Sequence, residues 1–223
     1  MEVLPHNLRY IKKTYMKRFL HLMAWIALAM LTFASCAEKF ESDPAKPEAY
    51  MKYFSLNEID SEDWGYLDVS VKERISRADV EKHIVGGWKS VAIYELDKNK
   101  SIVATKKLKS DLPASSEEPL VDYFEIKGFG KNQLIQYGLL EGRYENLDFA
   151  YDESDNSLSL DACWHVAHNG KLVYLSDGIM VCVDAKRWGT EEKPLVYMVV
   201  FEKVSDSTLG EWRKECPAGG LWV

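Results

Sequence analysis

The chain has 223 residues, of which 28 are Lys or Arg and 35 are Asp or Glu, so its net charge is −7. Five of the basic residues and one of the acidic residues fall in the first 35 positions, so the remaining 188 residues carry a net charge of −11. That length suits one domain with a sizeable core plus a tether. That charge excludes a nucleic-acid-binding surface and any membrane contact through a polybasic patch.

Residues 1–35 have the pattern of an export signal. Positive charge at Met16-Lys17-Arg18 is followed by an apolar run over 19–34, and no further charge occurs before Glu38. These are the n-region and h-region of a signal peptide, and either Met16 is the true first residue or the n-region is long. The alternative is an uncleaved membrane anchor, because the uncharged run approaches the ~20 residues that a spanning helix needs.

The end of this segment favours cleavage. The small residues Ala34 and Ser35 stand directly before Cys36, and Leu31-Thr32-Phe33-Ala34-Ser35-Cys36 resembles the lipobox at which lipoprotein signal peptidase cuts. The resemblance implies a diacylglycerol on the Cys36 sulfur and, in many bacteria, an added N-acyl chain such as palmitate. Several acyl chains, at ~0.8 kcal/mol per buried methylene, hold a protein at a bilayer almost permanently. We therefore expect an outer-membrane lipoprotein that faces the periplasm or the cell surface.

Two segments separate Cys36 from the main domain. Residues 36–48 are polar, with acidic residues and two prolines that cannot pack a core, and we expect a lipidated tether there. Acidic residues at this place also resemble the surface-export signal of lipoproteins in Bacteroides-like bacteria, although a solvated linker is acidic just as often. Residues 49–83 show no sustained period and are predicted to form an N-terminal extension, whose short helix has Ser76 as its N-cap and runs through about Ile84.

Beyond Gly87 the apolar residues follow period two, with turn signals about every ten residues, as in an antiparallel sandwich or barrel. Asn169-Gly170 and Asp177-Gly178 are two-residue hairpin signals. We predict an all-β fold in which a meander closes into an antiparallel up-and-down β-barrel, because closure removes unpaired strand edges. The predicted strands lie near 87–96, 101–107, 119–127, 133–140, 144–151, 157–166, 171–176, 179–184 and 195–204, and the polar stretch 106–119 is predicted to be a loop at the barrel mouth.

Gly86-Gly87-Trp88 opens the first of these strands and resembles the Gly-x-Trp signature of lipocalins. Residues 84–91 and 197–204 are similar to the first and last strands of lipocalin-like (calycin) domains in exported Bacteroides-type proteins. The resemblance implies a barrel over residues 84–204, in which Gly86 permits a sharp chain path and Trp88 plugs the narrow end. It also implies that Arg213 or Lys203 packs over Trp88. The tail 205–223 is predicted to contain a short helix through Trp212 with Ser207 as its N-cap.

Many aromatic residues fall in the predicted strands, and most are expected in the core. If the barrel holds a cavity, we expect the inward set to include Tyr137, Trp164, Tyr174 and Tyr197, which could pack an apolar or planar ligand and orient it through one hydroxyl. A barrel of about eight strands has room for side chains or for one small ligand. Two hypotheses stay open: a binding protein for a small, partly apolar ligand, and an envelope protein-protein or glycan interaction module with a filled barrel.

Three cysteines lie beyond the tether and are candidates for a disulfide. Export favours oxidation, and Cys163 with Cys182 is the predicted pair, although Cys216 could reach either. Cys163 and His165 share a strand face near Cys182, so a Cys/His metal site is the less favoured alternative, whereas His165 and His168 point to opposite faces. We expect neither a metal nor a cofactor.

The sequence specifies no reaction. It contains no Gly-x-Ser-x-Gly elbow, no phosphate-binding glycine loop and no His-Glu-x-x-His. Asp161, Asp184 and His165 come nearest to an acid–base set, but carboxylates on the wet face of a strand are ordinary surface. We therefore do not expect an enzyme, although a fold by itself never excludes grafted chemistry.

Overall fold

The structure is a computed structural model, which describes residues 46–59, 66–106, 108, 121–160, 170–184 and 195–220. These residues belong to one compact unit, Ser42–Val223. The leader, Cys36, most of the tether and residues 109–120 lie outside the described residues, as do Asp161, Cys163, Trp164, His165 and His168. Among the described residues, no helix is both long and apolar enough to cross a membrane.

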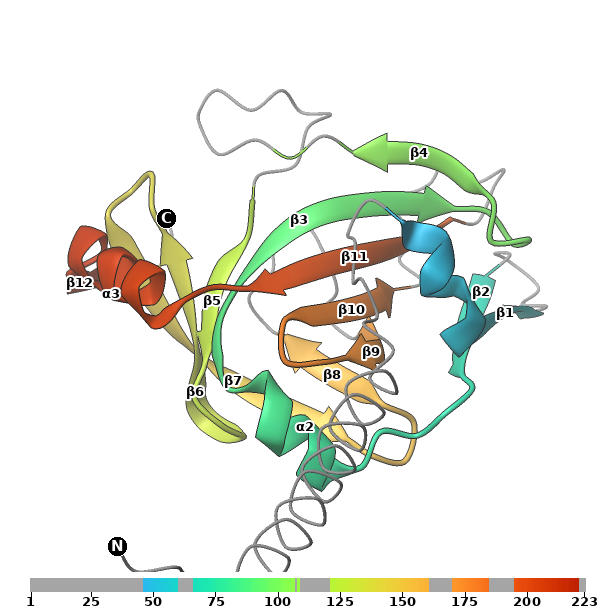
Figure 1. Cartoon of the computed structure of the whole chain (residues 1–223), viewed down its shortest axis with the longest axis horizontal. Helices are drawn as coiled ribbons and strands as arrows, with labels where there is room; N and C mark the ends of the chain where they lie inside the picture. The colour runs from blue at the N-terminus through green and yellow to red at the C-terminus, as the bar shows by residue number, and fades with distance from the viewer. Residues whose placement is uncertain are drawn as a thin grey trace, which may run out of the picture. The chain divides into compact units, whose positions relative to one another are not determined.

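Most of the described chain is antiparallel β-sheet, as the alternation of apolar and polar residues predicts. The main sheet contains β3 (Gly86–Leu96), β4 (Ile102–Lys106), β5 (Tyr123–Ile126), β6 (Gly130–Gly138), β7 (Arg143–Asp152), β8 (Ser157–Leu160), β9 (Gly170–Leu175), β10 (Ile179–Asp184), β11 (Val196–Lys203) and the short β12 (Ala218–Gly219). Its strands neighbour one another in the order β11-β10-β9-β8-β7-β6-β5-β3-β4, and β12 pairs with β7. Because β11 also pairs with β3, the sheet closes on itself into a barrel-like ring (Figure 1).

Strands β4 and β5 are two halves of one barrel strand. Both pair with the same edge of β3 and run in the same direction, since Ile93 lies opposite Lys106 and Lys89 lies opposite Tyr123. The polar insertion predicted from the sequence falls between them in the chain. With β4 and β5 counted together, every strand of the ring pairs with its neighbours in sequence, so the connections are local.

Helix α2 (Arg77–Ile84) covers one end of the ring, which we call the α2 end; the opposite end, where β3, β8 and β10 finish, is the far end. Ser76 caps α2 as predicted, because its side chain accepts a hydrogen bond from the Asp79 amide. Val80 and Ile84, four residues apart on one helix face, are fully buried against the barrel core. Burial of this face fixes the helix over the end of the barrel.

Helix α2 also contacts all three tight turns at its end of the ring. The Arg77 guanidinium lies 4.6 Å from the centre of the Phe129 ring in the β5–β6 turn. The Arg77 amide donates to Glu153 in the β7–β8 turn at 3.1 Å. His83 Nδ1 lies 2.5 Å from Asp177 in the β9–β10 turn. The α2 end is therefore closed by a helix tied to several turns.

Asn156 fastens the β7–β8 turn to the chain that leads into α2. It is fully buried, and its backbone φ is +58°. Its Oδ1 accepts from the Ile75 amide at 3.2 Å and from the Tyr151 hydroxyl at 3.1 Å. Its Nδ2 donates to the carbonyls of Glu73 at 3.0 Å and Leu172 at 3.1 Å. One side chain thus connects three segments that are distant in sequence.

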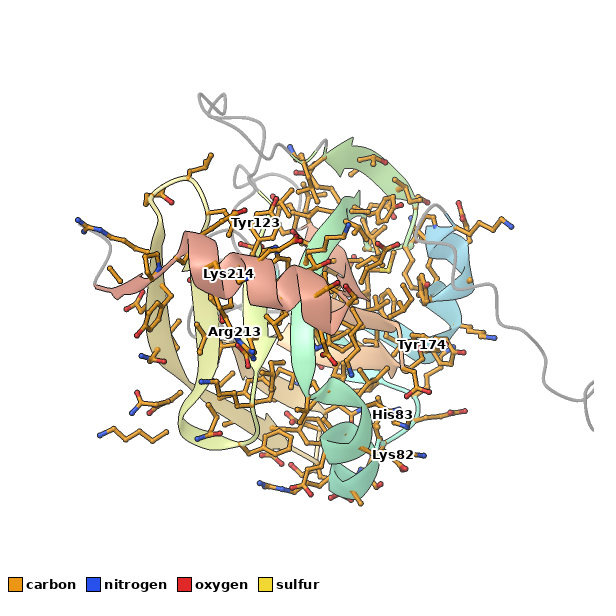
Figure 2. The ribbon with its side chains drawn as sticks, turned by 60° about the vertical axis from the view of Figure 1, so that its left-hand side comes forward. Lys82, His83, Tyr123, Tyr174, Arg213 and Lys214 are labelled. Atoms are coloured by element: carbon orange, nitrogen blue, oxygen red, sulfur yellow. The ribbon has the colours of Figure 1, made fainter. Side chains whose placement is uncertain are left out.

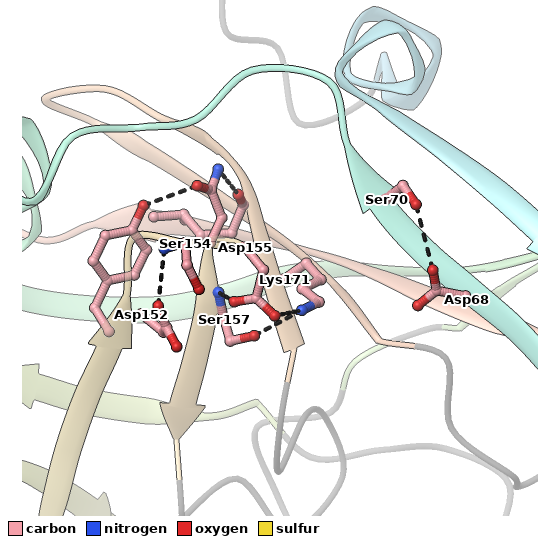
Figure 3. A network of polar contacts seen from close by, with 10 residues as sticks. Asp68, Ser70, Asp152, Ser154, Asp155, Ser157 and Lys171 are labelled. Atoms are coloured by element: carbon pink, nitrogen blue, oxygen red, sulfur yellow. Dashed lines mark hydrogen bonds and ion pairs between the residues drawn. The ribbon is translucent and has the colours of Figure 1, made fainter.

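The same turn carries a surface network of short polar contacts (Figure 3). Lys171 on β9 contacts the Asp155 carboxylate and donates to the Ser157 hydroxyl at 2.7 Å. The Asp152 carboxylate accepts from the Ser154 amide at 2.8 Å. These contacts order the turn from its solvent side, whereas Asn156 orders it from within.

The N-terminal extension packs on the outside of the barrel. It contains two short 3-10 helices, Pro47–Ala49 and Met51–Tyr53, and a hairpin of β1 (Phe54–Ile59) and β2 (Tyr66–Val71). Its buried residues Tyr50, Phe54, Leu67 and Val69 form one cluster with outward residues of β3, β9, β10 and β11. All six residues of β10 are buried as a result. Such a continuous apolar run is typical of a strand covered on both faces.

Helix α3 (Asp206–Glu215) covers another part of the outer surface, across β5, β6 and β7 (Figure 2). Its Leu209 and Trp212 are buried against Ile135 and Tyr137 of β6. The N-cap is Ser205, which accepts from the Thr208 amide, so the prediction of Ser207 was wrong by two residues. Ser205 has the extended backbone that an N-cap requires, and it directly follows the end of β11.

Candidate ligand-binding site in the barrel

Trp88 closes the barrel interior at the α2 end. Its ring is fully buried, and its indole nitrogen donates to the Ile84 carbonyl at 2.7 Å. Lys203 packs over the ring with its Nζ atom 5.3 Å from the ring centre, and this ammonium donates to the His83 carbonyl at 2.7 Å. Of the two basic residues considered from the sequence, Lys203 therefore covers Trp88, while Arg213 binds Glu125.

Gly86 lies where the chain passes from α2 into β3. Its φ is +130°, a conformation that side-chain-bearing residues rarely adopt. A Cβ atom at this position would lie 2.8 Å from the Lys203 Cε atom. Glycine is therefore required both for the backbone conformation and for the close approach of the lysine that covers Trp88.

The α2 half of the interior is filled by side chains. Trp88, Phe124, Phe149 and Phe201 are each at most 1% exposed, and the rings of Phe124 and Phe201 meet edge to face with centroids 5.2 Å apart. Leu134, Leu158 and Leu172 complete the packing. Aromatic pairs of this geometry add about 0.5–1.5 kcal/mol beyond the burial of their area. Side chains therefore leave no room for a ligand in the α2 half.

Tyr137 faces outward, which contradicts the predicted inward orientation. It lies in the cluster beneath α3, where its hydroxyl donates to Glu125 Oε2 at 2.7 Å. Arg213 of α3 binds both carboxylate oxygens of Glu125, at 2.6 and 3.2 Å. The strand is apolar on both faces because α3 covers its outer side, so alternation alone did not distinguish inside from outside. Tyr137 belongs to a structural contact between α3 and the barrel.

Tyr174 also faces outward, and a β-bulge is the reason. Tyr174 pairs with Val181 and Leu172 pairs with Cys182, which leaves Val173 as an extra residue in β9. The bulge puts both Val173 and Tyr174 on the outer surface. There Tyr174 contacts Tyr50 and Tyr53, each with ring centroids 5.3 Å apart, and Figure 2 shows it well away from α3. The predicted ligand contact of Tyr174 inside the barrel was wrong.

Tyr197 faces inward, among a group of polar residues at the far end. It packs against the inner core and lies directly opposite Asp184 of β10 and Glu95 of β3. Strand alternation and register place six polar side chains on the inner wall, and we call them the polar ring: Ser90, Glu95, Asp122, Gln136, Asp184 and Tyr197. Burial, together with Glu95, raises the pKa of Tyr197 to about 12, so its hydroxyl remains protonated at neutral pH.

Asp122 occupies the inner wall just before β5. Its amide donates to the Ser90 hydroxyl at 2.8 Å, and its carbonyl accepts from the Ser90 amide at 3.0 Å. Ser90 lies opposite Phe201, an inner-core residue, which fixes this pair on the inside. The Asp122 side chain is buried, and burial raises its pKa to about 7. Its carboxyl group is therefore poised between the ionised and protonated forms at neutral pH.

Two buried acceptors of the polar ring have no hydrogen-bond partner in the part of the chain that the structure describes. They are Asp122 Oδ2 and Gln136 Oε1, on residues that are 7% and 9% exposed. Gln136 lies opposite Phe124, two residues along the strand from Asp122, so the two side chains are diagonal neighbours. A buried acceptor without a donor costs about 1–3 kcal/mol, and native proteins contain few of them. The pair therefore points to a missing donor.

The remaining predicted site residues divide between the interior and the undescribed chain. Asp184 is 8% exposed and belongs to the polar ring, not to a wet outer face. Cys182 is buried on the inner wall and Cys216 is buried at the C-cap of α3, and the two do not form a disulfide with each other. The predicted pairing of Cys182 with Cys163 stays a prediction, because Cys163 lies outside the described residues. Within the described ranges, no group of three metal-ligating side chains could hold a metal ion.

A groove lies outside the barrel, between α3, the start of β3 and the end of β11. It is open and has a volume of about 500 Å³. Its lining includes Lys89, Lys203, Glu211, Tyr123 and Trp212. The rings of Tyr123 and Trp212 contact each other edge to face at 5.2 Å, and both belong to the cluster that attaches α3. The groove is thus bounded by residues with a packing role.

Comparison of the chain with protein-family models, with curated proteins and with solved structures finds no match.

Proposed function

We propose that this protein is an exported, lipid-anchored, lipocalin-like binding protein that takes one small, partly apolar ligand into the far half of an up-and-down barrel. The Cys36 lipobox supports the anchor, and the Gly86-Gly87-Trp88 start, with Lys203 over the indole, supports the lipocalin-like assignment. The acyl chains on Cys36 hold the barrel at the outer membrane, where it faces the periplasm or the cell surface.

The observation that carries this proposal is the pair of unpartnered acceptors on Asp122 and Gln136. Both sit inside a closed sheet, one step along the wall from the apolar side chains of Phe124 and Leu134. Binding sites for small molecules are mostly apolar, with a few convergent polar groups that orient the ligand. A donor on the ligand would satisfy both acceptors and recover the free energy that they cost in the empty protein.

The second candidate function is an envelope protein-protein or glycan interaction module with a filled barrel. It is favoured by the complete burial of Trp88, Phe149 and Phe201, which leaves no room in the α2 half of the interior. In that case the outer groove beside α3 is the surface for a partner. The two candidates differ in where a bound molecule contacts the protein, so they can be separated by experiment.

Native mass spectrometry of the lipidated protein, purified from its own host, tests the proposal. We expect a fraction of the molecules to carry a retained small molecule that is released when the protein is denatured. A matched preparation of Gln136→Leu, which removes one acceptor from the inner wall, is expected to retain less of it. If wild-type protein carries only its covalent lipid in repeated preparations, the filled-barrel alternative replaces the proposal.

A further inference from the structure

We infer that the ligand carries a cationic hydrogen-bond donor, an ammonium or similar group on an apolar body, and that Asp122 and Gln136 bind this donor. The inference rests on the proposed function and adds the chemical class of the ligand. Three features of the inner wall support it: the unpartnered acceptor atoms, the carboxylates around them, and an apolar side chain next to them.

The two unpartnered atoms are acceptors, and a carboxylate of a third strand adjoins them. Gln136 lies directly opposite Glu145 of β7. Glu145 is two residues from Leu147, which packs against the inner core, so both side chains face inward. Asp122, Gln136 and Glu145 therefore form a row across the inner faces of three neighbouring strands. A carboxylate and an amide oxygen accept hydrogen bonds, so the group that completes this row must donate.

The charges on the inner wall favour a donor that is also positive. Strand register places four carboxylates on the inner wall: Glu95, Asp122, Glu145 and Asp184. Lys106 of β4 is the one basic residue that the described chain brings to this wall, and it already binds Glu95 at 2.9 Å. An anionic ligand would meet this acidic wall with no free cation to balance it. An ammonium would gain charge-assisted hydrogen bonds, which are about twice as strong as neutral ones.

The apolar part of the ligand has a place next to this row. Leu147 of β7 lies two residues beyond Glu145 on the same inner face, and it is only partly buried against the inner core. Phe124 and Leu134 beside it are already enclosed by packing, so the body of a ligand whose ammonium lies at Asp122 contacts Leu147. This arrangement suits an amphipathic amine and does not suit a fatty acid, whose carboxylate would face the acidic wall.

Two fluorescent probes with the same body and opposite charge test the inference. Dansylcadaverine ends in an ammonium, and 6-(dansylamino)hexanoate ends in a carboxylate on the same pentamethylene chain. The full lipidated chain in phosphatidylcholine nanodiscs is titrated with each probe, and empty nanodiscs are subtracted. We expect the cationic probe to bind at least about tenfold more tightly than the anionic probe, the difference typical of one charge-assisted hydrogen bond.

Three variants test which residues cause the preference for the cationic probe. Asp122→Asn removes the charge at the proposed contact, and it is expected to weaken binding of the cationic probe about tenfold. Asp68→Asn makes the same chemical change on the exposed outer hairpin and is expected to change binding less than twofold. Gln136→Leu provides a second interior variant, and near-ultraviolet circular dichroism of each variant verifies that the barrel is folded.

The outcomes separate this inference from the proposed function. Equal or tighter binding of the anionic probe overturns the inference and leaves a ligand-binding barrel in place. Cation binding that is equal in wild type, Asp122→Asn and Gln136→Leu also overturns it. If neither probe binds, the inference is wrong, and native mass spectrometry decides whether the binding function falls with it. Tighter cation binding that depends on Asp122 and Gln136 but not on Asp68 supports the inference.

Discussion

The Lys203 ammonium lies over the Trp88 ring, 5.3 Å from its centre, and so connects the end of β11 to the start of β3. Because it also donates to the His83 carbonyl, its loss removes a cation–π contact and a hydrogen bond together. We expect Lys203→Met to lower the free energy of unfolding by about 1–2 kcal/mol in urea titrations. Lys89→Met is the control, since Lys89 forms only an exposed pair with Glu202, and a change within about 0.5 kcal/mol is expected. Equal effects of the two substitutions would contradict this role of Lys203.

Asn156 supports the α2 end through four hydrogen bonds, and Asn132 offers a matched control. Both have left-handed backbones, with φ of +58° and +57°, but Asn132 is exposed. Glycine at either position keeps the backbone favourable, so only the side chain is removed. We expect Asn156→Gly to lower the free energy of unfolding by about 2–4 kcal/mol, because it leaves buried partners unsatisfied. Asn132→Gly should be nearly neutral, and thermal unfolding of both variants measures the difference.

The pair of Glu125 and Arg213 holds α3 against the barrel, and its contribution depends on pH. Burial by itself would raise the pKa of Glu125, but hydrogen bonds from Arg213 and Tyr137 outweigh it and lower the pKa. A carboxylate with a lowered pKa stabilises the fold above its unfolded pKa of about 4.3, and this stabilisation is lost as pH falls through its folded pKa. We expect Arg213→Met to cost about 1–2 kcal/mol at pH 7, because the half-exposed arginine is partly screened by solvent.

The cost of Arg213→Met should shrink as the pH falls below about 4, where Glu125 becomes protonated. Lys214→Met, at the neighbouring exposed position of α3, is the control for loss of one positive charge (Figure 2). Urea titrations at several pH values provide the measurement. A cost that stays constant from pH 7 to pH 3 would show that the pair acts through packing and not through charge.

Asp122 is expected to lower stability at neutral pH. Its pKa is raised to about 7 by burial, whereas the unfolded value is about 3.9. The folded protein therefore retains a proton that the unfolded chain has released, and stability falls as the pH rises from about 4 to about 7. We expect Asp122→Asn to be more stable than wild type by about 2–4 kcal/mol at pH 8 and to differ little at pH 4. Parallel pH–stability curves of the two proteins would refute this assignment.

Affinity for the cationic probe should depend on the same titration of Asp122, but it should rise with pH, whereas stability falls. Ionised Asp122 attracts an ammonium, so affinity should rise as the pH increases from 6 to 8. The other titratable groups on this wall are Glu95 with Lys106, Glu145, Asp184 and Tyr197. The pKa of Tyr197 lies near 12, and Lys106 is already bound to Glu95. Fluorescence titrations across this range, with Asp122→Asn as the insensitive control, measure the effect.

Lipidation at Cys36 is expected to determine where the protein resides. We expect Cys36→Ser to prevent palmitate incorporation and cleavage before residue 36, because the thioether cannot form. Cys216→Ser makes the same change outside the lipobox and should leave both intact. Radiolabelled palmitate and the mass of the processed protein provide the readouts. Palmitate incorporation that persists in Cys36→Ser would remove the anchor from the proposed function.

Much of the barrel could be predicted because period two is a local signal. The β3 strand and the hairpin at Asp177-Gly178 fall where alternation and turn chemistry place them. Helix α2 was predicted by its N-cap Ser76 and the spacing of Val80 and Ile84. The hairpin over β10 was not predicted, because the alternation at Leu67, Val69 and Val71 is short and the extension packs on the outer surface of strands that are distant in sequence.

The site was harder to predict because it depends on register. The bulge at Val173 reverses the expected facing of Tyr174, and no local sequence signal marks it. Asp122 precedes a strand, and Gln136 lies between two apolar residues, so no sequence motif marks either one as a binding residue. Only the pairing of β5 with β6 brings them together on the inner wall.

A crystal structure of the lipoprotein purified from its own host, without added ligand, would show whether the barrel interior holds a ligand. We expect continuous density for a small molecule inside the barrel, with a donor atom within about 3 Å of Asp122 Oδ2 and Gln136 Oε1. Both acceptors bound instead by side chains of the protein, or by isolated waters alone, would contradict it.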